Sequence, residues 1–448
     1  MDFIETCRKL ISLDSTPSHG NKAVAEYVAQ LCRDKGFHVE EQHESHLNLD
    51  QTNLVIRPTA QRPALEFMLQ NHLDTIDPGP YVLWSDNSYN PFDAIIKDGN
   101  IYGLGTAEVK LDFLCKLEAL SKFPVTTAWK LPPVLVGTYG EELGMAGILR
   151  LIRKNMVSAK MALVGEPSDM NIIHACNGFA AVEIIIPFCQ AEQKFREEHN
   201  LRESTATQSR LFKGKAAHSS TPHLGENALR KLFDYLTQLP ESVTIMEIDG
   251  GTSHNTIPAQ AFIEIDLVLG YDDPMIRKLN RFYQVFKKLE QELMQYQDPE
   301  FYPNHPTLNL GVVRTMEDHI SIHGSCRLLP MISNEIYEAW MAQLKSICDQ
   351  IGAQFRVIDY KRPYRTDANS MLTRACLAEL EKMGRSPQLI TQPSINEAAM
   401  LSRIGIETVC FGAGKRDGNI HTPNENVSLE DLKTSVEFYQ RIIERFCL

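Results

Sequence analysis

The stretch Val134-Leu-Val-Gly-Thr-Tyr-Gly-Glu-Glu142 joins a short apolar run to two adjacent carboxylates, and it indicates both the fold class and a site. The run follows Pro132 and Pro133 and ends at Gly140, which is typical of a buried strand. Small residues then lead into a helix through 148–152. Two acids at a buried strand end repel each other and lose hydration unless cations lie nearby. The stretch therefore favours a metal or proton-transfer site, although an exposed helix N-terminus would also accept two acids.

The length and composition are those of a globular protein with more than one domain. The chain has 448 residues, of which 43% are hydrophobic and 23% are charged. A formal net charge of −12 argues against nucleic acid and anionic membranes as partners. No apolar run reaches the roughly 18 residues that a transmembrane helix needs.

The cysteines and the first residues predict a cytoplasmic location. The ten cysteines are scattered without a Cys-x-x-Cys pair, which is typical of reduced thiols in a protein core. Residues 1–6 show neither the basic region nor the apolar region of a secretory signal.

Two other apolar runs also end in candidate ligands. His72 and Asp74 follow the run at 64–69, and Glu166 follows the run at 161–164. His72 and Asp74 share one face of a strand, so the acid could orient the imidazole. A lone histidine is more often structural, but ligands of open α/β sheets bind where the strands end. We therefore expect these side chains to meet the two acids at 141 and 142.

A glycine-rich segment, Tyr102-Gly-Leu-Gly-Thr-Ala-Glu-Val-Lys110, precedes a helical pattern. Its glycine spacing fits neither G-x-x-x-x-G-K-[ST] nor G-x-G-x-x-G, the phosphate-binding patterns. Glu108 places a negative charge where a phosphate would need bare N–H groups. An acidic metal ligand at a helix start is the better interpretation. Beyond the apolar run at 408–411, a loop adds His421.

The candidate metal ligands are imidazoles and carboxylates from five places in the chain. They are His72, Glu108, Glu142, Glu166 and His421. This donor set without thiolate suits zinc, cobalt or manganese. One bridging acid, plus one histidine and one acid for each ion, would make a two-metal site that polarises an amide carbonyl. Glu141 is then the remaining carboxylate, suited to act as general base.

The middle of the chain has a different pattern. Residues 178–362 alternate strands and helices in a way that predicts an α+β domain inserted into an α/β domain of residues 1–177 and 363–448. His218, Asn255 and Arg327 suit an anionic substrate group, although ordinary surface polarity accounts for each equally well.

In these motifs the chain resembles the co-catalytic zinc aminoacylase and carboxypeptidase superfamily. The nearest branch is that of acetylornithine deacetylases and succinyl-diaminopimelate desuccinylases, and the resemblance covers nearly the whole chain in the same order. The segments that carry it are Asn71-His-Leu-Asp-Thr75, Tyr102 to Lys110, Gly140-Glu-Glu142, Gly165-Glu-Pro-Ser168, and His421 with Glu425.

The resemblance implies a zinc-peptidase-like fold and two divalent ions, Zn²⁺ first, with Co²⁺ or Mn²⁺ as alternatives. The catalytic domain would have a central mixed sheet flanked by helices, and the insert would be a ferredoxin-like lid and dimerisation domain. His72 and Glu166 would hold one ion. Glu142 and His421 would hold the other, and Glu108 would bridge the two.

The resemblance also implies roles for residues that bind no metal. Asp74 would orient the first histidine ligand, and Glu141 would be the general base. His218 would polarise the scissile carbonyl. Asn255 and Arg327 would bind the substrate, the arginine through a carboxylate, and the protein would form a homodimer.

Three features depart from the family pattern. The bridging acid is usually Asp and here is Glu108, and the residue after Lys110 is usually Gly and here is Leu111. A charged helix expected at 274–295 separates Asn255 from Arg327, which indicates an insertion.

The expected function is hydrolysis of the amide bond of a small N-acyl amino acid, with N-acetylornithine as the first candidate. A dipeptidase, an aminoacylase or a desuccinylase-like hydrolase is the alternative within the superfamily. The change to Glu108 leaves open a third possibility, a non-catalytic relative that binds metal or ligand.

Overall fold

The computed structural model describes residues 2–241, 243–267 and 274–448, which form two compact units. Unit 1 consists of Met1–Ala175, Tyr364–Thr391 and Asn396–Leu448. Unit 2 consists of Cys176–Pro363 and Gln392–Ile395. The main boundaries between the units therefore lie at 175–176 and 363–364. The boundaries predicted from the sequence lie at 177–178 and 362–363.

Unit 1 is built on a nine-stranded mixed sheet, as the sequence predicts for the catalytic part. In spatial order the strands are β1 (His38–His46), β2 (Leu49–Arg57), β6 (Pro133–Thr138), β3 (Glu66–His72), β7 (Ala159–Gly165), β20 (Glu407–Phe411), β8 (Ile172–Cys176) and β18 (Tyr364–Arg365), with β19 (Leu389–Gln392) beside β8. The four strands β6, β3, β7 and β20 are parallel neighbours. β2 and β3 are buried along most of their length, because the sheet is covered on both faces.

The helices of unit 1 supply the rest of this core. They are α1 (Phe3–Ile11), α2 (Lys22–Asp34), α3 (Lys110–Leu120), α4 (Ala146–Arg153), α9 (Met371–Lys382), α10 (Glu397–Ser402) and α11 (Leu429–Cys447). α3 is almost entirely buried and packs against α11. Short turns η1 (Tyr81–Leu83) and η2 (Ser85–Asn87) and a three-stranded sheet of β4 (Ile95–Lys97), β5 (Asn100–Tyr102) and β21 (Asn426–Ser428) complete the unit. Pairing of β5 with β21 brings the glycine-rich segment next to the loop that carries His421.

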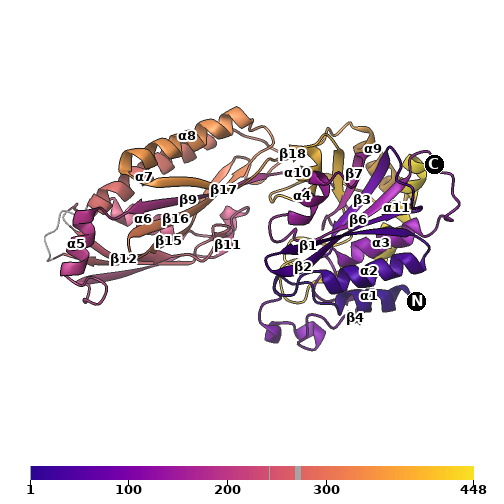
Figure 1. Ribbon diagram of the computed structural model, residues 1–448, viewed down its shortest axis with the longest axis horizontal. Helices are drawn as coiled ribbons and strands as arrows, with labels where there is room; N and C mark the ends of the chain where they lie inside the picture. The colour runs from indigo at the N-terminus through magenta and orange to yellow at the C-terminus, as the bar shows by residue number, and fades with distance from the viewer. Residues whose placement is uncertain (1, 242, 268–273) are drawn as a thin grey trace. The chain divides into compact units, whose positions relative to one another are not determined.

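Unit 2 has a seven-stranded antiparallel sheet. Its strands are, in spatial order, β10 (Gln208–Lys213), β14 (Gln260–Asp266), β12 (Thr244–Gly250), β15 (Thr307–Thr315), β16 (His319–Leu328), β9 (Gly178–Pro187) and β17 (Gln354–Lys361). Its helices are α5 (Gln190–Glu198), α6 (Ala228–Leu236), α7 (Pro274–Leu293) and α8 (Asn334–Ile351), with the turn η3 (Pro222–Leu224) and the strand pair β11 (Ala217–His218) and β13 (Thr256–Ile257). α7 and α8 lie side by side over the sheet (Figure 1).

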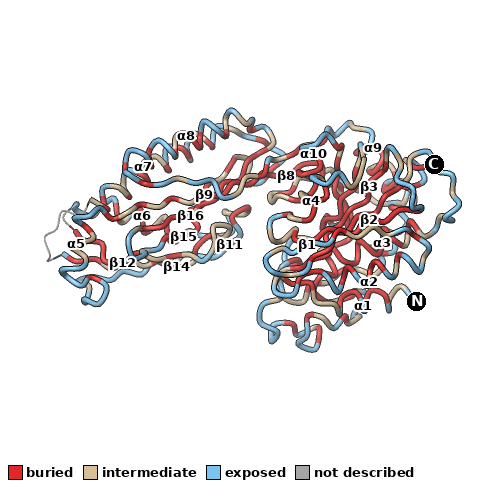
Figure 2. Tube along the Cα trace, in the orientation of Figure 1, coloured by how far each residue is buried: buried red, intermediate tan, exposed pale blue. Residues whose placement is uncertain are grey.

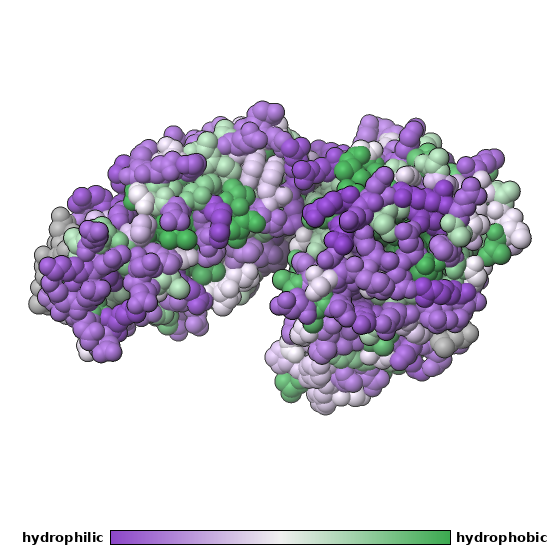
Figure 3. Space-filling view, in the orientation of Figure 1, coloured by the Kyte–Doolittle hydropathy of each residue, from purple (hydrophilic) through white to green (hydrophobic). Residues whose placement is uncertain are grey.

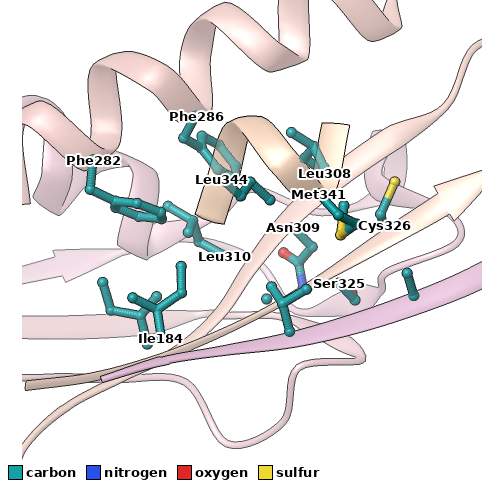
Figure 4. Close-up of a pocket in the computed structure, with 14 residues that line it drawn as sticks. Ile184, Phe282, Phe286, Leu308, Asn309, Leu310, Ser325, Cys326, Met341 and Leu344 are labelled. Carbon is teal, nitrogen blue, oxygen red and sulfur yellow. The ribbon is translucent and has the colours of Figure 1, made fainter. Parts of the chain in front are cut away.

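A small apolar cavity lies between these two helices and the sheet. Its volume is about 30 Å³, and its walls include Phe286 of α7, Leu344 of α8 and Ile184 of β9 (Figure 4). Ala180 and Val182 of β9 line the same cavity. Because side chains alternate along a strand, the residues between them point to the opposite face of the sheet.

The surface of each unit is mainly hydrophilic in the view of Figure 3. None of the helices in the described parts of the chain combines the length and the apolar character that a membrane crossing requires.

Candidate active site

Strand register in unit 1 brings the predicted motifs to one edge of the sheet. In the parallel pair β3–β6, His72 lies opposite Thr138, so the turn with Glu141 and Glu142 begins just beyond the histidine. In the pair β7–β20, Gly165 lies opposite Phe411, so Glu166 emerges beside the loop that continues to the second histidine. Glu166 is buried, and its N–H donates to the carbonyl of Phe411 at 3.3 Å.

The structure brings candidate ligand atoms together in two groups. His72, Glu141 and Glu142 each offer an atom within 4.8 Å of the others. Glu108, Glu142 and His421 do the same. In the second group, Nε2 of His421 lies 2.6 Å from Oε2 of Glu108 and 3.0 Å from Oε1 of Glu142.

The two groups share one residue and leave one predicted ligand outside. Glu142 belongs to both groups, and Glu108 belongs to the second. Glu166 belongs to neither group among the described residues. The Glu108 carboxylate is paired with the imidazole of His421, because opposite charges attract each other.

The hydrogen bonding of its two ring nitrogens suits His72 to bind a metal ion. Its Nδ1 lies 3.1 Å from the backbone oxygen of Asp74 and 3.7 Å from Oδ1 of the same residue. Its Nε2 is buried and has no hydrogen-bond partner in the described structure. Histidine typically binds a divalent metal through one ring nitrogen while a hydrogen bond to the other nitrogen holds the ring in place. In His72 the buried Nε2 is available to a metal ion in this way.

Asp74 has a second role that the sequence did not predict. Its Oδ1 accepts the backbone N–H of Glu141 at 3.2 Å, and its Oδ2 accepts that of Glu142 at 3.1 Å. The carboxylate of Asp74 therefore lies near the imidazole of His72 and also holds the turn that carries Glu141 and Glu142.

The charges at this edge are strongly coupled. Burial, together with the neighbouring charge of Glu142, raises the pKa of Glu141 well above its usual range. Burial opposes charge on His421, but the carboxylates of Glu108 and Glu142 outweigh it and raise the pKa of that imidazole to about 12. A carboxylate with a raised pKa is a stronger base, which suits Glu141 to proton transfer.

Glu425 holds the glycine-rich segment in place. Its Oε1 accepts three backbone N–H groups, from Gly105 at 3.1 Å, Ala107 at 2.8 Å and Glu108 at 3.0 Å. The sequence places Glu425 in a motif but assigns it no role. The sequence feature that could have indicated this role is an acid four residues after the candidate ligand His421, in the same loop.

A buried polar network lies beneath the site. Lys116 donates to Oδ1 of Asn71 at 2.7 Å and lies 3.0 Å from Asp112. Asp112 also accepts hydrogen bonds from Asn71 at 2.9 Å and from the hydroxyl of Tyr439 at 2.7 Å. Asp112, two residues after Lys110, thus ties α3, β3 and α11 together next to His72.

Glu397 is a further buried acid that sequence reasoning missed. It begins α10, and its carboxylate accepts a hydrogen bond from the hydroxyl of Thr138 at 2.8 Å and another from Gln70. Burial raises the pKa of Glu397 to about 7. An asparagine cap followed by an acid in a short helix indicates only a helix start, so the sequence carries no sign of this position.

The three predicted residues of unit 2 lie in one cluster. Arg327 donates to Oδ1 of Asn255 at 2.5 Å and to Oγ of Ser219 at 3.1 Å. His218 is exposed, pairs with Thr256 across β11 and β13, and has Nδ1 2.6 Å from Oγ of Ser220. The structure thus joins Asn255 and Arg327, which are 72 residues apart in the chain.

Histidines and carboxylates at one sheet edge, with an unpartnered buried imidazole nitrogen among them, fit a site for divalent metal ions. Residues 68–445 match the family model described as peptidase family M20/M25/M40. The protein belongs to this family.

Individual relatives agree with that assignment. An acetylornithine deacetylase of Myxococcus xanthus is 23% identical over 99% of this chain and 97% of its own. A family M20 metallo-carboxypeptidase of Sulfolobus solfataricus superimposes with a TM-score of 0.64 at 18% identity, covering 100% of this chain and 99% of its own. An aminoacylhistidine dipeptidase of Vibrio alginolyticus gives a TM-score of 0.64 at 16% identity, covering 99% and 96%. At these identities the solved structures establish the fold.

Proposed function

We propose that this protein is a two-metal amidohydrolase that removes the acyl group from an N-acyl amino acid, with N-acetylornithine as the first candidate. The observation that carries the proposal is the pair of ligand groups that share Glu142, with Glu141 next to it in the chain. Deacetylase relatives that span the whole chain support the choice of substrate.

The residues present fit a pair of divalent ions. The donors are nitrogen and oxygen only, and the buried Nε2 of His72 has no other partner among the described atoms. When bound, such ions polarise an amide carbonyl and make a water molecule more acidic. Zn²⁺ suits these ligands, with Co²⁺ and Mn²⁺ as alternatives. The residues that would hold the ions are His72, Glu108, Glu142, Glu166 and His421.

The protein's own side chains divide the remaining work. Glu141 takes a proton from the attacking water and returns it to the leaving nitrogen, a role that its raised pKa supports. Asp74 keeps Glu141 in place through the backbone N–H that it accepts. In unit 2, His218 polarises the scissile carbonyl and Asn255 binds the substrate. Arg327 binds the substrate carboxylate, a role that its burial supports.

The replacement Glu141→Gln tests this proposal. We expect the variant to bind as much metal as the wild type, since the proposal assigns Glu141 as the base and not as one of the five ligands, but to turn over N-acetylornithine about 10²- to 10⁴-fold more slowly. The control is Glu317→Gln, the same change at a side chain that is 85% exposed. Full activity of Glu141→Gln with zinc or cobalt present would overturn the assignment of the base.

A dipeptidase or aminoacylase is the second candidate, because the solved structures with this fold include a metallo-carboxypeptidase and an aminoacylhistidine dipeptidase. Turnover of N-acetylornithine compared with that of simple dipeptides separates the two. If the unusual Glu108 instead marks a non-catalytic relative, the wild type will hydrolyse neither, and Glu108→Asp will be needed for any activity.

A further inference from the structure

A buried cation of unit 1 makes all of its hydrogen bonds close to one candidate ligand. The side chain of Lys116 in α3 is 0% exposed. Its three N–H donors meet the backbone oxygen of Gln70 at 2.9 Å, Oδ1 of Asn71 at 2.7 Å and Oδ2 of Asp112 at 3.0 Å. Gln70 and Asn71 directly precede His72, the last residue of β3. The lysine therefore fixes the end of β3 that carries the histidine.

The side chain of Asn71 links this lysine to the segment of a second candidate ligand. Its Oδ1 accepts the hydrogen bond from Lys116. Its Nδ2 donates to Oδ2 of Asp112 at 2.9 Å and to the carbonyl oxygen of Val109 at 3.4 Å. Val109 directly follows Glu108. Because the amide oxygen and both amide hydrogens are bonded, the asparagine side chain holds the end of β3 and the segment after Glu108 in one arrangement.

The backbone before a third candidate ligand packs on the same atoms. Gly165 ends β7, which pairs with β3, and it directly precedes Glu166. A Cβ atom at Gly165 would lie 1.8 Å from Nδ2 of Asn71 and 2.7 Å from Oδ2 of Asp112, so only glycine lets the end of β7 approach this closely. The place of Glu166 is therefore set against the asparagine and the aspartate.

The two ions of the proposed site depend unequally on these contacts. In the proposal, His72 and Glu166 hold one ion, and both directly follow residues that touch the buried network. Glu142 and His421 hold the other ion. The turn with Glu142 is held by a different carboxylate, that of Asp74, and His421 is 44% exposed on its loop.

We propose that Asn71, Asp112 and Lys116 are positioning residues that set the geometry of one of the two metal ions, the ion of His72 and Glu166. The inference rests on the proposed function, which it deepens by naming the residues that regulate the two halves of the site separately. The ammonium and the carboxylate compensate each other's charge, so the network acts through the placement of the strand ends. The competing interpretation is that the pair only stabilises the packing of α3.

Two pairs of replacements in the full-length protein distinguish these interpretations. Lys116→Met with Asp112→Asn removes both charges of the network, so that no unpaired charge stays buried. The control is Arg57→Met with Glu66→Gln, which removes another buried ion pair, with Nε 2.6 Å from Oε1. Glu66 begins the same strand that His72 ends, roughly 20 Å away. Both pairs should lower the unfolding midpoint in urea, and only the first should change the metal site.

Each pair is made in two backgrounds that keep one ion each. His421→Ala leaves the histidine of the first ion, and His72→Ala leaves that of the second. Calorimetric titration with Zn²⁺ measures the affinity, and the visible absorption of added Co²⁺ reports the coordination. We expect the network pair to weaken Zn²⁺ binding by about 10- to 100-fold and to alter the Co²⁺ spectrum in the His421→Ala background. In the His72→Ala background the affinity should stay nearly unchanged. Asn71→Ala, which keeps the ion pair, should show the same selective loss.

Equal Zn²⁺ affinities for the network pair and the control pair in the His421→Ala background would overturn the inference, as would an equal loss in both backgrounds. Hydrolysis by the wild type tests the proposed function separately. Two bound ions without hydrolysis of any acyl amino acid or dipeptide would refute the proposed function, while a selective loss of the first ion would still support the positioning role. A wild type that binds no Zn²⁺ would refute both.

Discussion

Replacement of Asp74 by asparagine tests how the site is held together. In the wild type, the two carboxylate oxygens accept the N–H groups of Glu141 and Glu142 at 3.2 and 3.1 Å. Asparagine keeps one acceptor and turns an NH₂ group toward the other N–H, so one hydrogen bond is lost and two donors face each other. A hydrogen bond to a charged group contributes about 1.5–3 kcal/mol, and Asp74 is buried, so the unfolding free energy should fall by about that amount.

The same change should weaken metal binding. Outer partners of metal ligands typically contribute 10- to 100-fold in affinity, and Asp74 contacts both the His72 side and the Glu142 turn, so we expect a loss of about that size. Urea unfolding in the presence of a chelator measures the first effect, and calorimetric titration with zinc measures the second.

The control for Asp74→Asn is the same change at Asp77, which is exposed three residues further along. An Asp74→Asn variant whose unfolding free energy is within about 0.5 kcal/mol of the wild type, with unchanged zinc affinity, would refute the reasoning. It would show that the turn with the two acids is held by its own backbone.

Three other replacements test separate features of unit 1. Gly147→Ala would place a Cβ 2.3 Å from the carbonyl oxygen of Tyr139, so the unfolding free energy measured in urea should fall by about 3 kcal/mol. An unchanged unfolding midpoint would contradict this close packing. Burial lowers the pKa of Lys110 to about 8. The unfolded chain therefore binds more protons between pH 8 and about 10.5. Across that window the unfolding free energy of the wild type should rise relative to Lys110→Met by up to about 3 kcal/mol, whereas parallel curves would argue against a depressed pKa. Glu425→Ala removes the acceptor shared by three N–H groups, so the unfolding free energy should fall by about 3 kcal/mol and zinc binding should weaken. Glu425→Gln keeps one oxygen acceptor and should show smaller losses. Equal behaviour of the two variants would contradict the role of the shared oxygen.

Much of the catalytic unit could be predicted because its signals are local. Apolar runs that end in His72, Glu142 and Glu166 predicted strands β3, β6 and β7, and the structure aligns these strands in parallel at one edge. Turn residues and alternating side chains depend on a few neighbouring residues, so a sequence can show them directly.

Residues with no pattern of their own could not be predicted. Glu397 lies next to Thr138 only because α10 packs against β20 and β7, and these strands lie far from Thr138 in the chain. Between Asn255 and Arg327, which share a hydrogen bond, the chain forms a 20-residue helix and the three strands β13, β14 and β15. Such contacts depend on which segments pack together, and no short spacing encodes that.

The sequence by itself determined which residue types end the strands of unit 1, and hence the kind of chemistry that the protein performs. The tertiary structure alone decided that Glu142 is shared between two ligand groups, that one carboxylate of Asp74 holds both acids, and that Lys116 donates to Asn71 next to His72. Side-chain chemistry and periodicity are local properties of a chain. Strand register and the loss of water at a site arise only when distant segments pack, and these set both charge and geometry.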